Sequence, residues 1–216
     1  MDDPLKLPPE AFCKEDEAPD HIFYTAPRFV THIDGPAITA VTELYRTLFP
    51  PGSAVLDLMS SWISHLPREV AYGEIIGHGL NGLELEANPR LSRFFLQNLN
   101  ENPVLPLASD SLDAAAICVS IQYLQQPVAV LREIARVLRP GSPVVITFSN
   151  RCFPTKAVAI WRGLDDEGHG RLVALYLSEA GFAEIEIRAL IVRGAGGDPL
   201  FAVIGRAPHQ KMHDLK

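Results

Sequence analysis

Cysteine is scarce in this sequence, and Cys13, Cys118 and Cys152 form no CxxC pair. Three isolated cysteines fit a reducing compartment better than a disulfide framework. No apolar run reaches the ~20 residues that a membrane-spanning helix needs. Residues 1–20 are acidic and proline-rich, unlike the apolar core of a signal peptide. We therefore expect a cytoplasmic protein that has no membrane partner.

Clusters of basic residues are also missing. The 19 Lys and Arg residues are scattered and are outnumbered by 26 Asp and Glu residues, which gives a net charge of -7. Nucleic-acid binders normally show a basic patch or stripe, so the sequence predicts no nucleic-acid partner. No group of His, Cys, Asp and Glu residues has metal-ligand spacing, so no metal site is expected. No feature of the sequence specifies an oligomeric state.

The sequence does contain a regular alternation of short apolar runs and amphipathic stretches, which suits one domain with a small appendage. Such alternation indicates a mostly parallel sheet with helices on both faces. The last two strands have no helix between them, so they must be antiparallel. The expected helices are 36–49, 82–100 with a break near Pro89, 127–140 and 168–182, with a short helix or turn at 62–72; the expected strands are 53–59, 73–80, 112–121, 142–149, 183–192 and 199–207.

The N-terminal residues do not follow this alternation. Residues 1–35 are predicted to form a tail and then an arm or lid, 36–208 the folded domain, and 209–216 a C-terminal tail. Residues 1–20 are expected to be poorly ordered unless they dock on the domain. Two interpretations stand for residues 21–35, where aromatics flank Pro27-Arg28: a lid over a site, or an arm packed on the core.

The second half of the domain carries a family resemblance. Its expected helix ends at Pro140-Gly141, a pair that terminates a helix and turns the chain into the next strand. Three motifs lie in this half: Leu105-Pro106-Leu107, Leu112-Asp113 and Leu138-Arg139-Pro140-Gly141. With these motifs, the chain resembles a class I S-adenosylmethionine-dependent methyltransferase of type 11. The resemblance covers residues 36–206 and implies a Rossmann-like, seven-stranded fold with strand order 3-2-1-4-5-7-6.

The loop that binds the cofactor in this family departs from the family's pattern. Asp57 keeps the acidic place at the end of the first strand, but Met59, Ser61 and Ile63 stand where the family has three glycines. Side chains there crowd a closely approaching ligand, and positive φ angles become costly. The resemblance implies cofactor contacts from a wider set: Asp57, Met59, Ser60, Ser61, Trp62, Gly79, Leu80, Asn81, Asn98, Leu99 and Val119, with the two serines as hydroxyl donors and Trp62 as a wall.

Two further family positions are altered. The acid that binds the ribose hydroxyls is replaced by Gly79, and Asn81, Glu84 or Glu86 are its candidate substitutes. The polar residue that binds the adenine amine corresponds to Asn98, whose amide oxygen can still accept a hydrogen bond from that amine.

Candidate catalytic residues come from the arm and from the segment after the fourth family strand. They are Tyr24, His32, Gln122 and Tyr123. Two interpretations stand for His32 and Asp34. They form an acid–base pair if they share a strand face, whereas Asp34 caps the helix that begins at Pro36 if the segment turns. Arg28 is either a partner for a carboxylate of cofactor or substrate, or a plain surface residue.

The resemblance implies transfer of a methyl group from S-adenosylmethionine to an O, N or S atom of a small-molecule substrate. Two other functions stand beside it. One is a non-catalytic binding or scaffold protein with the same fold. The other is a nicotinamide-dependent oxidoreductase, because residues 77–82 spell a GxGxxG motif after a strand and before a helix.

Overall fold

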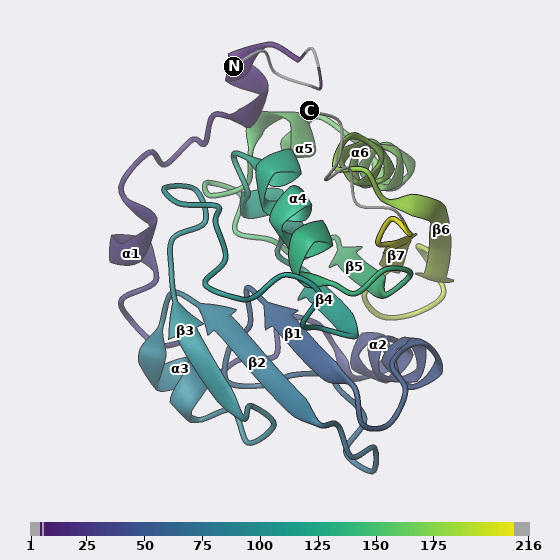
Figure 1. Cartoon of the computed structure of the whole chain (residues 1–216). Coiled ribbons are helices and arrows are strands. Elements are labelled where there is room, and N and C mark those ends of the chain that lie inside the picture. The colour runs from purple at the N-terminus through teal and green to yellow at the C-terminus, as the bar shows by residue number, and fades with distance from the viewer. Residues whose placement is uncertain (1–4, 6, 210–216) are drawn as a thin grey trace, which may run out of the picture.

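The computed structural model describes residue 5 and residues 7–209 of the chain. Its centre is a seven-stranded sheet with the order β3-β2-β1-β4-β5-β7-β6 (Figure 1). The first five strands in chain order are parallel, and β7 runs antiparallel to both β5 and β6. The expected fold and strand order are confirmed. The strands are β1 Ala54–Leu58, β2 Glu74–Gly79, β3 Arg93–Leu96, β4 Ala114–Cys118, β5 Pro143–Ser149, β6 Ala183–Ile191 and β7 Leu200–Arg206.

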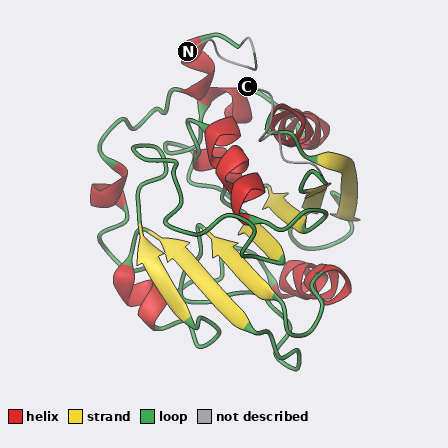
Figure 2. Cartoon of the chain, viewed as in Figure 1, coloured by secondary structure: helices red, strands yellow, loops and turns green. Residues whose placement is uncertain are grey.

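Helices cover both faces of this sheet (Figure 2). In the described residues, no helix has the length and apolar character needed to cross a membrane. The helices are η1 Pro9–Phe12, α1 Asp20–Phe23, α2 Gly35–Leu48, α3 Gly82–Glu86, η2 Ile121–Tyr123, α4 Pro127–Val137, α5 Ala159–Arg162 and α6 Asp166–Glu179.

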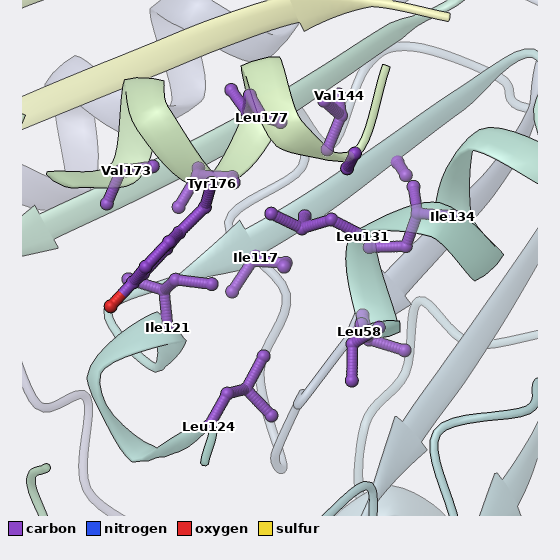
Figure 3. Packing of buried hydrophobic residues seen from close by; sticks show 14 of the residues in the cluster. Leu58, Ile117, Ile121, Leu124, Leu131, Ile134, Val144, Val173, Tyr176 and Leu177 are labelled. Atoms are coloured by element: carbon purple, nitrogen blue, oxygen red, sulfur yellow. The ribbon is translucent and has the colours of Figure 1, made fainter. Parts of the chain in front are cut away.

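Two buried clusters hold the layers together. On one face, α4 and α6 pack on the sheet, and Figure 3 shows Leu131 of α4 and Leu177 of α6 beside Val144 of β5. On the other face, α2 packs Val41 and Tyr45 against the same sheet. Because the central strands are buried on both sides, they appear in the sequence as continuous apolar runs, and all seven residues of β5 are buried.

The predicted helix at 82–100 is wrong after its first turn and a half. The helix α3 ends at Glu86, and residues 93–96 form the edge strand β3, which pairs in parallel with β2. Pro89 prevents the helix from continuing, and the Phe94-Phe95 pair favours extended backbone. Residues 62–72 form turns, which is one of the two forms expected for them.

The N-terminal segment docks on the domain. The Asp16 N–H donates to the Thr155 carbonyl at 2.9 Å, and the Ala159 N–H donates to the Cys13 carbonyl at 2.9 Å. Lys14 is buried, although it belongs to a segment expected to be a tail. The predicted C-terminal tail lies outside the described residues, apart from His209, and so do residues 1–4 and 6 of the predicted N-terminal tail.

Candidate functional site

A cavity of about 470 Å³ opens at the carboxyl ends of the parallel strands. It lies where β1 and β4 are neighbours and their connections leave in opposite directions, the place where open α/β sheets bind ligands. Its floor comes from the segments that follow β1, β2, β4 and β5, and its roof comes from the N-terminal arm, including Tyr24, Arg28 and His32. The arm therefore forms part of the cavity wall.

The loop after β1 keeps a left-handed turn without a glycine. Met59 has a φ of 57°, a conformation that costs a residue with a side chain roughly 1–2 kcal/mol. Hydrogen bonds inside the loop hold it: Ser60 Oγ donates to Asp57 Oδ2 at 2.6 Å, and Ser64 Oγ donates to the same oxygen. Burial raises the pKa of Asp57, and the two hydroxyl donors oppose that change. The Ser60 hydroxyl, which we expected to face a cofactor, is thus used to fix the loop.

His78 of β2 holds this loop from the next strand. The Met59 N–H donates to His78 Nδ1 at 3.1 Å, so the ring proton is on Nε2, which donates to the Gln97 carbonyl at 2.8 Å. Burial lowers the pKa of His78 to about 4, which keeps the imidazole neutral at pH 7. Sequence reasoning missed this role. The available signal was a histidine between Gly77 and Gly79, inside an otherwise apolar strand.

We expect His78 to make stability depend on pH. Its pKa is about 4 in the folded chain and about 6.5 when unfolded, so the unfolded state binds the extra proton between these values. The free energy of unfolding should fall as pH drops from 6.5 to 4, by up to about 1.4 kcal/mol per pH unit from this residue. Thermal or urea unfolding of the wild type and His78→Asn across this range measures the difference.

Asparagine is the matched control because its amide oxygen can still accept from the Met59 N–H without titrating. Asp57, whose pKa is raised, and His65, whose pKa burial lowers to about 4, are present in both proteins and cancel in the comparison. Equal pH slopes for the two proteins would contradict the assignment of the neutral imidazole.

Gly79 stands where the family has its ribose-binding acid, and the structure gives a steric reason. A Cβ atom added at Gly79 would lie 2.8 Å from the Ser60 carbonyl oxygen. A Cβ at Gly77 would meet the Leu91 side chain at 2.3 Å. These two glycines of the GxGxxG motif therefore allow other parts of the chain to pack closely against β2. The helix that follows the motif, α3, has only five residues, which is short for a dinucleotide-binding helix. Nothing in this geometry favours a dinucleotide site.

Asn81 and Glu84 line the cavity close to Gly79, whereas Glu86 is exposed and does not. Asn81 Oδ1 caps α3, and its amide nitrogen donates to the Tyr24 and Thr25 carbonyls at 2.9 and 3.1 Å. Glu84 Oε1 accepts from the Arg28 N–H at 2.7 Å, and Oε2 accepts from Ser61 Oγ at 2.5 Å. Both residues tie the arm to the floor of the cavity.

The remaining predicted cofactor contacts mostly reach the cavity. Leu80, Asn98, Leu99 and Val119 all line it. The Asn98 amide is engaged locally, since its oxygen accepts from the Asn100 N–H at 3.1 Å and its nitrogen donates to Glu101 at 2.8 Å.

Trp62 and Gln122 do not line the cavity. Trp62 Nε1 donates to the Val30 carbonyl at 2.9 Å, and the indole packs edge-on against Phe29 of the arm. Gln122 is 2% exposed, and its Nε2 donates to the Val119 carbonyl at 2.9 Å. Trp62 therefore supports the arm and Gln122 supports the segment after β4, and the contacts with cofactor or substrate predicted for them stay predictions.

The other predicted catalytic residues, Tyr24 and His32 of the arm and Tyr123 after β4, lie together around Phe153. Tyr123 OH accepts from the Phe153 N–H at 2.8 Å, and His32 packs edge-on against the Phe153 ring. Asp34 does not pair with His32, since it caps α2 by accepting from the Ala37 N–H at 3.0 Å. Burial raises the pKa of Tyr24 and raises that of Tyr123 to about 12, so both phenols stay protonated. Burial lowers the pKa of His32, which favours a neutral imidazole.

Residues 70–146 match the sequence profile of a family described as Methyltransferase domain. No curated protein matches the chain. Among solved structures, a chain of the complex between the Haloferax volcanii Trm112 methyltransferase activator and a methyltransferase is 18% identical. The match covers 82% of this chain and 91% of that chain, with a TM-score of 0.61. This chain therefore has the fold of the class I methyltransferases, and its residues 70–146 match a methyltransferase family model.

Two other solved members of the methyltransferase fold show its functional range. The phosphoethanolamine N-methyltransferase 2 of Haemonchus contortus, solved with S-adenosyl-L-methionine, is 13% identical over 79% of this chain and 52% of that chain, with a TM-score of 0.57. The [4+2]-cyclase SpnF is 16% identical over 79% of this chain and 81% of that chain, with a TM-score of 0.56. At these identities the likeness concerns the fold, so function has to be argued from the site.

Four buried polar atoms of this methyltransferase-fold cavity have no hydrogen-bond partner in the described part of the chain. They are Arg28 Nη1, Tyr45 OH, His65 Nδ1 and Ser120 Oγ, and all four residues line the cavity. Buried polar groups are nearly always hydrogen-bonded, and each exception needs an explanation. A ligand with several polar groups supplies one. No group of His, Cys, Asp and Glu among the described residues is arranged to hold a metal ion.

Proposed function

We propose that this chain binds S-adenosylmethionine in the cavity and transfers its methyl group to an O, N or S atom of a small molecule. The observation that carries the proposal is the cavity itself. It lies at the switch point of a methyltransferase fold, below a β1 loop that keeps a left-handed residue at Met59. Its volume of about 470 Å³ suits a small-molecule site.

The residues present fit this cofactor. The unpartnered atoms of His65 and Ser120 offer hydrogen bonds to polar groups of the cofactor. The Glu84 carboxylate, beside Gly79, can accept from ribose hydroxyls with its remaining lone pairs, and Asn98 and Leu99 lie where the adenine is expected. S-adenosylmethionine, when bound, supplies an electrophilic methyl group.

The chain's own contribution is to position the acceptor, exclude water and hold a proton acceptor near it. The arm roofs the cavity and keeps solvent from its floor. Of the catalytic residues proposed from the sequence, His32 suits the base best, because its imidazole lines the cavity and its pKa is lowered. The protonated phenols of Tyr24 and Tyr123 suit hydrogen-bond donation.

Calorimetry with S-adenosylhomocysteine tests cofactor binding. We expect the wild type to bind it and Leu80→Trp to lose at least tenfold in affinity, because Leu80 lines the cavity and an indole would fill part of it. Leu83→Trp is the matched control. Leu83 is 60% exposed, lies three residues further along the same segment and does not line the cavity.

Binding by the wild type and by these two variants distinguishes the possible functions. Absence of wild-type binding at millimolar ligand would reject the methyltransferase proposal and favour the non-catalytic scaffold. That alternative draws its support from the loop serines, whose hydroxyls are already occupied inside the protein. Equal losses for both tryptophan variants would show that the ligand binds elsewhere.

A further inference from the structure

Arg28 is a cation in the cavity wall without a counter-ion. Two other charged groups of the wall do have partners of opposite charge: Asp20 pairs with Lys14 and Lys156, and Arg151 pairs with Asp198. In the part of the chain that the structure describes, no carboxylate forms an ion pair with Arg28. Its only contact with an acid runs through its backbone N–H, which donates to Glu84.

The Arg28 side chain is held in one orientation. Nη2 donates to the Phe23 carbonyl at 2.8 Å, and the guanidinium carbon lies 4.4 Å from the centre of the Phe23 ring and 5.3 Å from that of Phe153. Aromatic faces stabilise a guanidinium without neutralising it. Nη1 is buried and has no partner. A fixed, desolvated donor of this kind is pre-organised to meet a charged acceptor on a ligand.

The surroundings of Arg28 identify the side of the cavity on which that acceptor lies. Phe153 follows β5, and Tyr123, whose ring lies 6.0 Å from that of Phe153, follows β4. The end of β1, with Asp57, and the loop that follows it belong to the cofactor side under the proposed function. The guanidinium therefore packs on the side that faces the acceptor, beside apolar ring surface.

We propose that Arg28 binds a carboxylate of the acceptor substrate, and that this substrate is a flat, apolar acid resting against Tyr123 and Phe153. The inference rests on the proposed function, because it assigns the second ligand of the same cavity. A singly charged anion fits better than a phosphate, since Asp57 and Glu84 line the same cavity and repel higher negative charge. The unpartnered nitrogen matches a carboxylate oxygen, and the rings match a planar body.

Benzoate and benzamide are suitable probes because they have the same shape and differ in charge. In the presence of saturating S-adenosylhomocysteine, we expect the wild type to bind benzoate at least tenfold more tightly than benzamide by calorimetry. Arg28→Gln should bind both probes equally and keep its affinity for S-adenosylhomocysteine within threefold. Arg28→Lys keeps the charge and should retain part of the preference, which gives a second folded variant if the glutamine variant is unstable.

Each remaining outcome is decisive. Equal binding of the two probes by the wild type would overturn the inference. A second result would also overturn it: Arg28→Gln lowers the affinity for S-adenosylhomocysteine more than tenfold but leaves the affinity for 5′-methylthioadenosine unchanged. Because 5′-methylthioadenosine lacks the carboxylate, Arg28 would then bind the carboxylate of the cofactor. A benzoate preference without any binding of S-adenosylhomocysteine, measured with the probes alone, would support the anion site and reject the proposed function.

Discussion

Replacing Gly79 with aspartate, which restores the acid typical of the family, is expected to damage this protein. The added Cβ would lie 2.8 Å from the Ser60 carbonyl oxygen, which belongs to backbone and cannot swing away like a side chain. Ser60 is held there because its N–H donates to the His78 carbonyl at 2.6 Å. The variant should lose about 3 kcal/mol in unfolding free energy, the upper range for overpacking, and its affinity for S-adenosylhomocysteine should fall.

Urea unfolding and calorimetry measure both effects, with Gly82→Asp as the control. A Cβ at Gly82 meets only the end of Leu96, at 3.6 Å, and an acid in the first turn of α3 complements the helix dipole. Gly82→Asp should therefore change stability by less than about 0.5 kcal/mol. Tighter cofactor binding by Gly79→Asp would mean that the β1 loop moves freely, contrary to the hydrogen bonds that fix it.

The parts of the fold that the sequence predicted are those with a clear local pattern. Strands β4 and β5 are apolar runs bounded by turn residues, and α4 between them has a strong apolar stripe that ends at Pro140-Gly141. Strand β3 was missed because Arg93–Leu96 lies at the sheet edge with most of its side chains exposed, so it shows neither alternation nor a buried run. Its pairing with β2 is a tertiary property.

Most of the site residues that the sequence predicted line the cavity, but their contacts could not be predicted. Motif positions bring Asp57, Met59 and Asn98 to it, because a family alignment conveys which strand end a residue follows. An alignment does not convey side-chain direction, and Trp62, predicted as a wall of the site, does not line the cavity and donates to the Val30 carbonyl. An alignment does not convey hydrogen-bond partners either. Ser60 and Ser64 both donate to Asp57, which depends on a loop conformation that the glycine pattern of the motif does not predict.

Lys156→Met is expected to release the N-terminal arm from the domain. Lys156 is fully buried, and its ammonium donates to the Ala18 carbonyl at 2.6 Å and lies 3.2 Å from Asp16 and 3.6 Å from Asp20. Methionine fills similar space but leaves the Ala18 carbonyl and Asp16 without this cation, while Asp20 keeps only Lys14. Removing one partner of a buried ion cluster costs about 3–5 kcal/mol, here concentrated on the docking of the arm.

Hydrogen exchange measures this effect residue by residue. We expect lost protection at amides that hydrogen-bond within or across the arm, such as those of Asp16, Tyr24 and Arg28. The amides of β4 and β5 should keep their protection, because local opening of the arm needs less energy than global unfolding. Arg162→Met is the matched control, because Arg162 of α5 also pairs with an acid of the N-terminal segment. Its ion pair with Glu15 is solvent-exposed, so its loss should cost less than about 1 kcal/mol.

The consequence for the cavity follows from the same contacts. Asn100 Nδ2 donates to Asp20 at 2.9 Å and to the Tyr123 carbonyl at 3.0 Å, so the buried cluster connects the arm to the segments after β3 and β4. Freeing the arm removes Tyr24, Arg28 and His32 from the roof together. Lys156→Met should therefore weaken the binding of both S-adenosylhomocysteine and benzoate, whereas Arg28→Gln should weaken the binding of benzoate alone. If Lys156→Met leaves both affinities unchanged, the docked arm does not form part of the binding site.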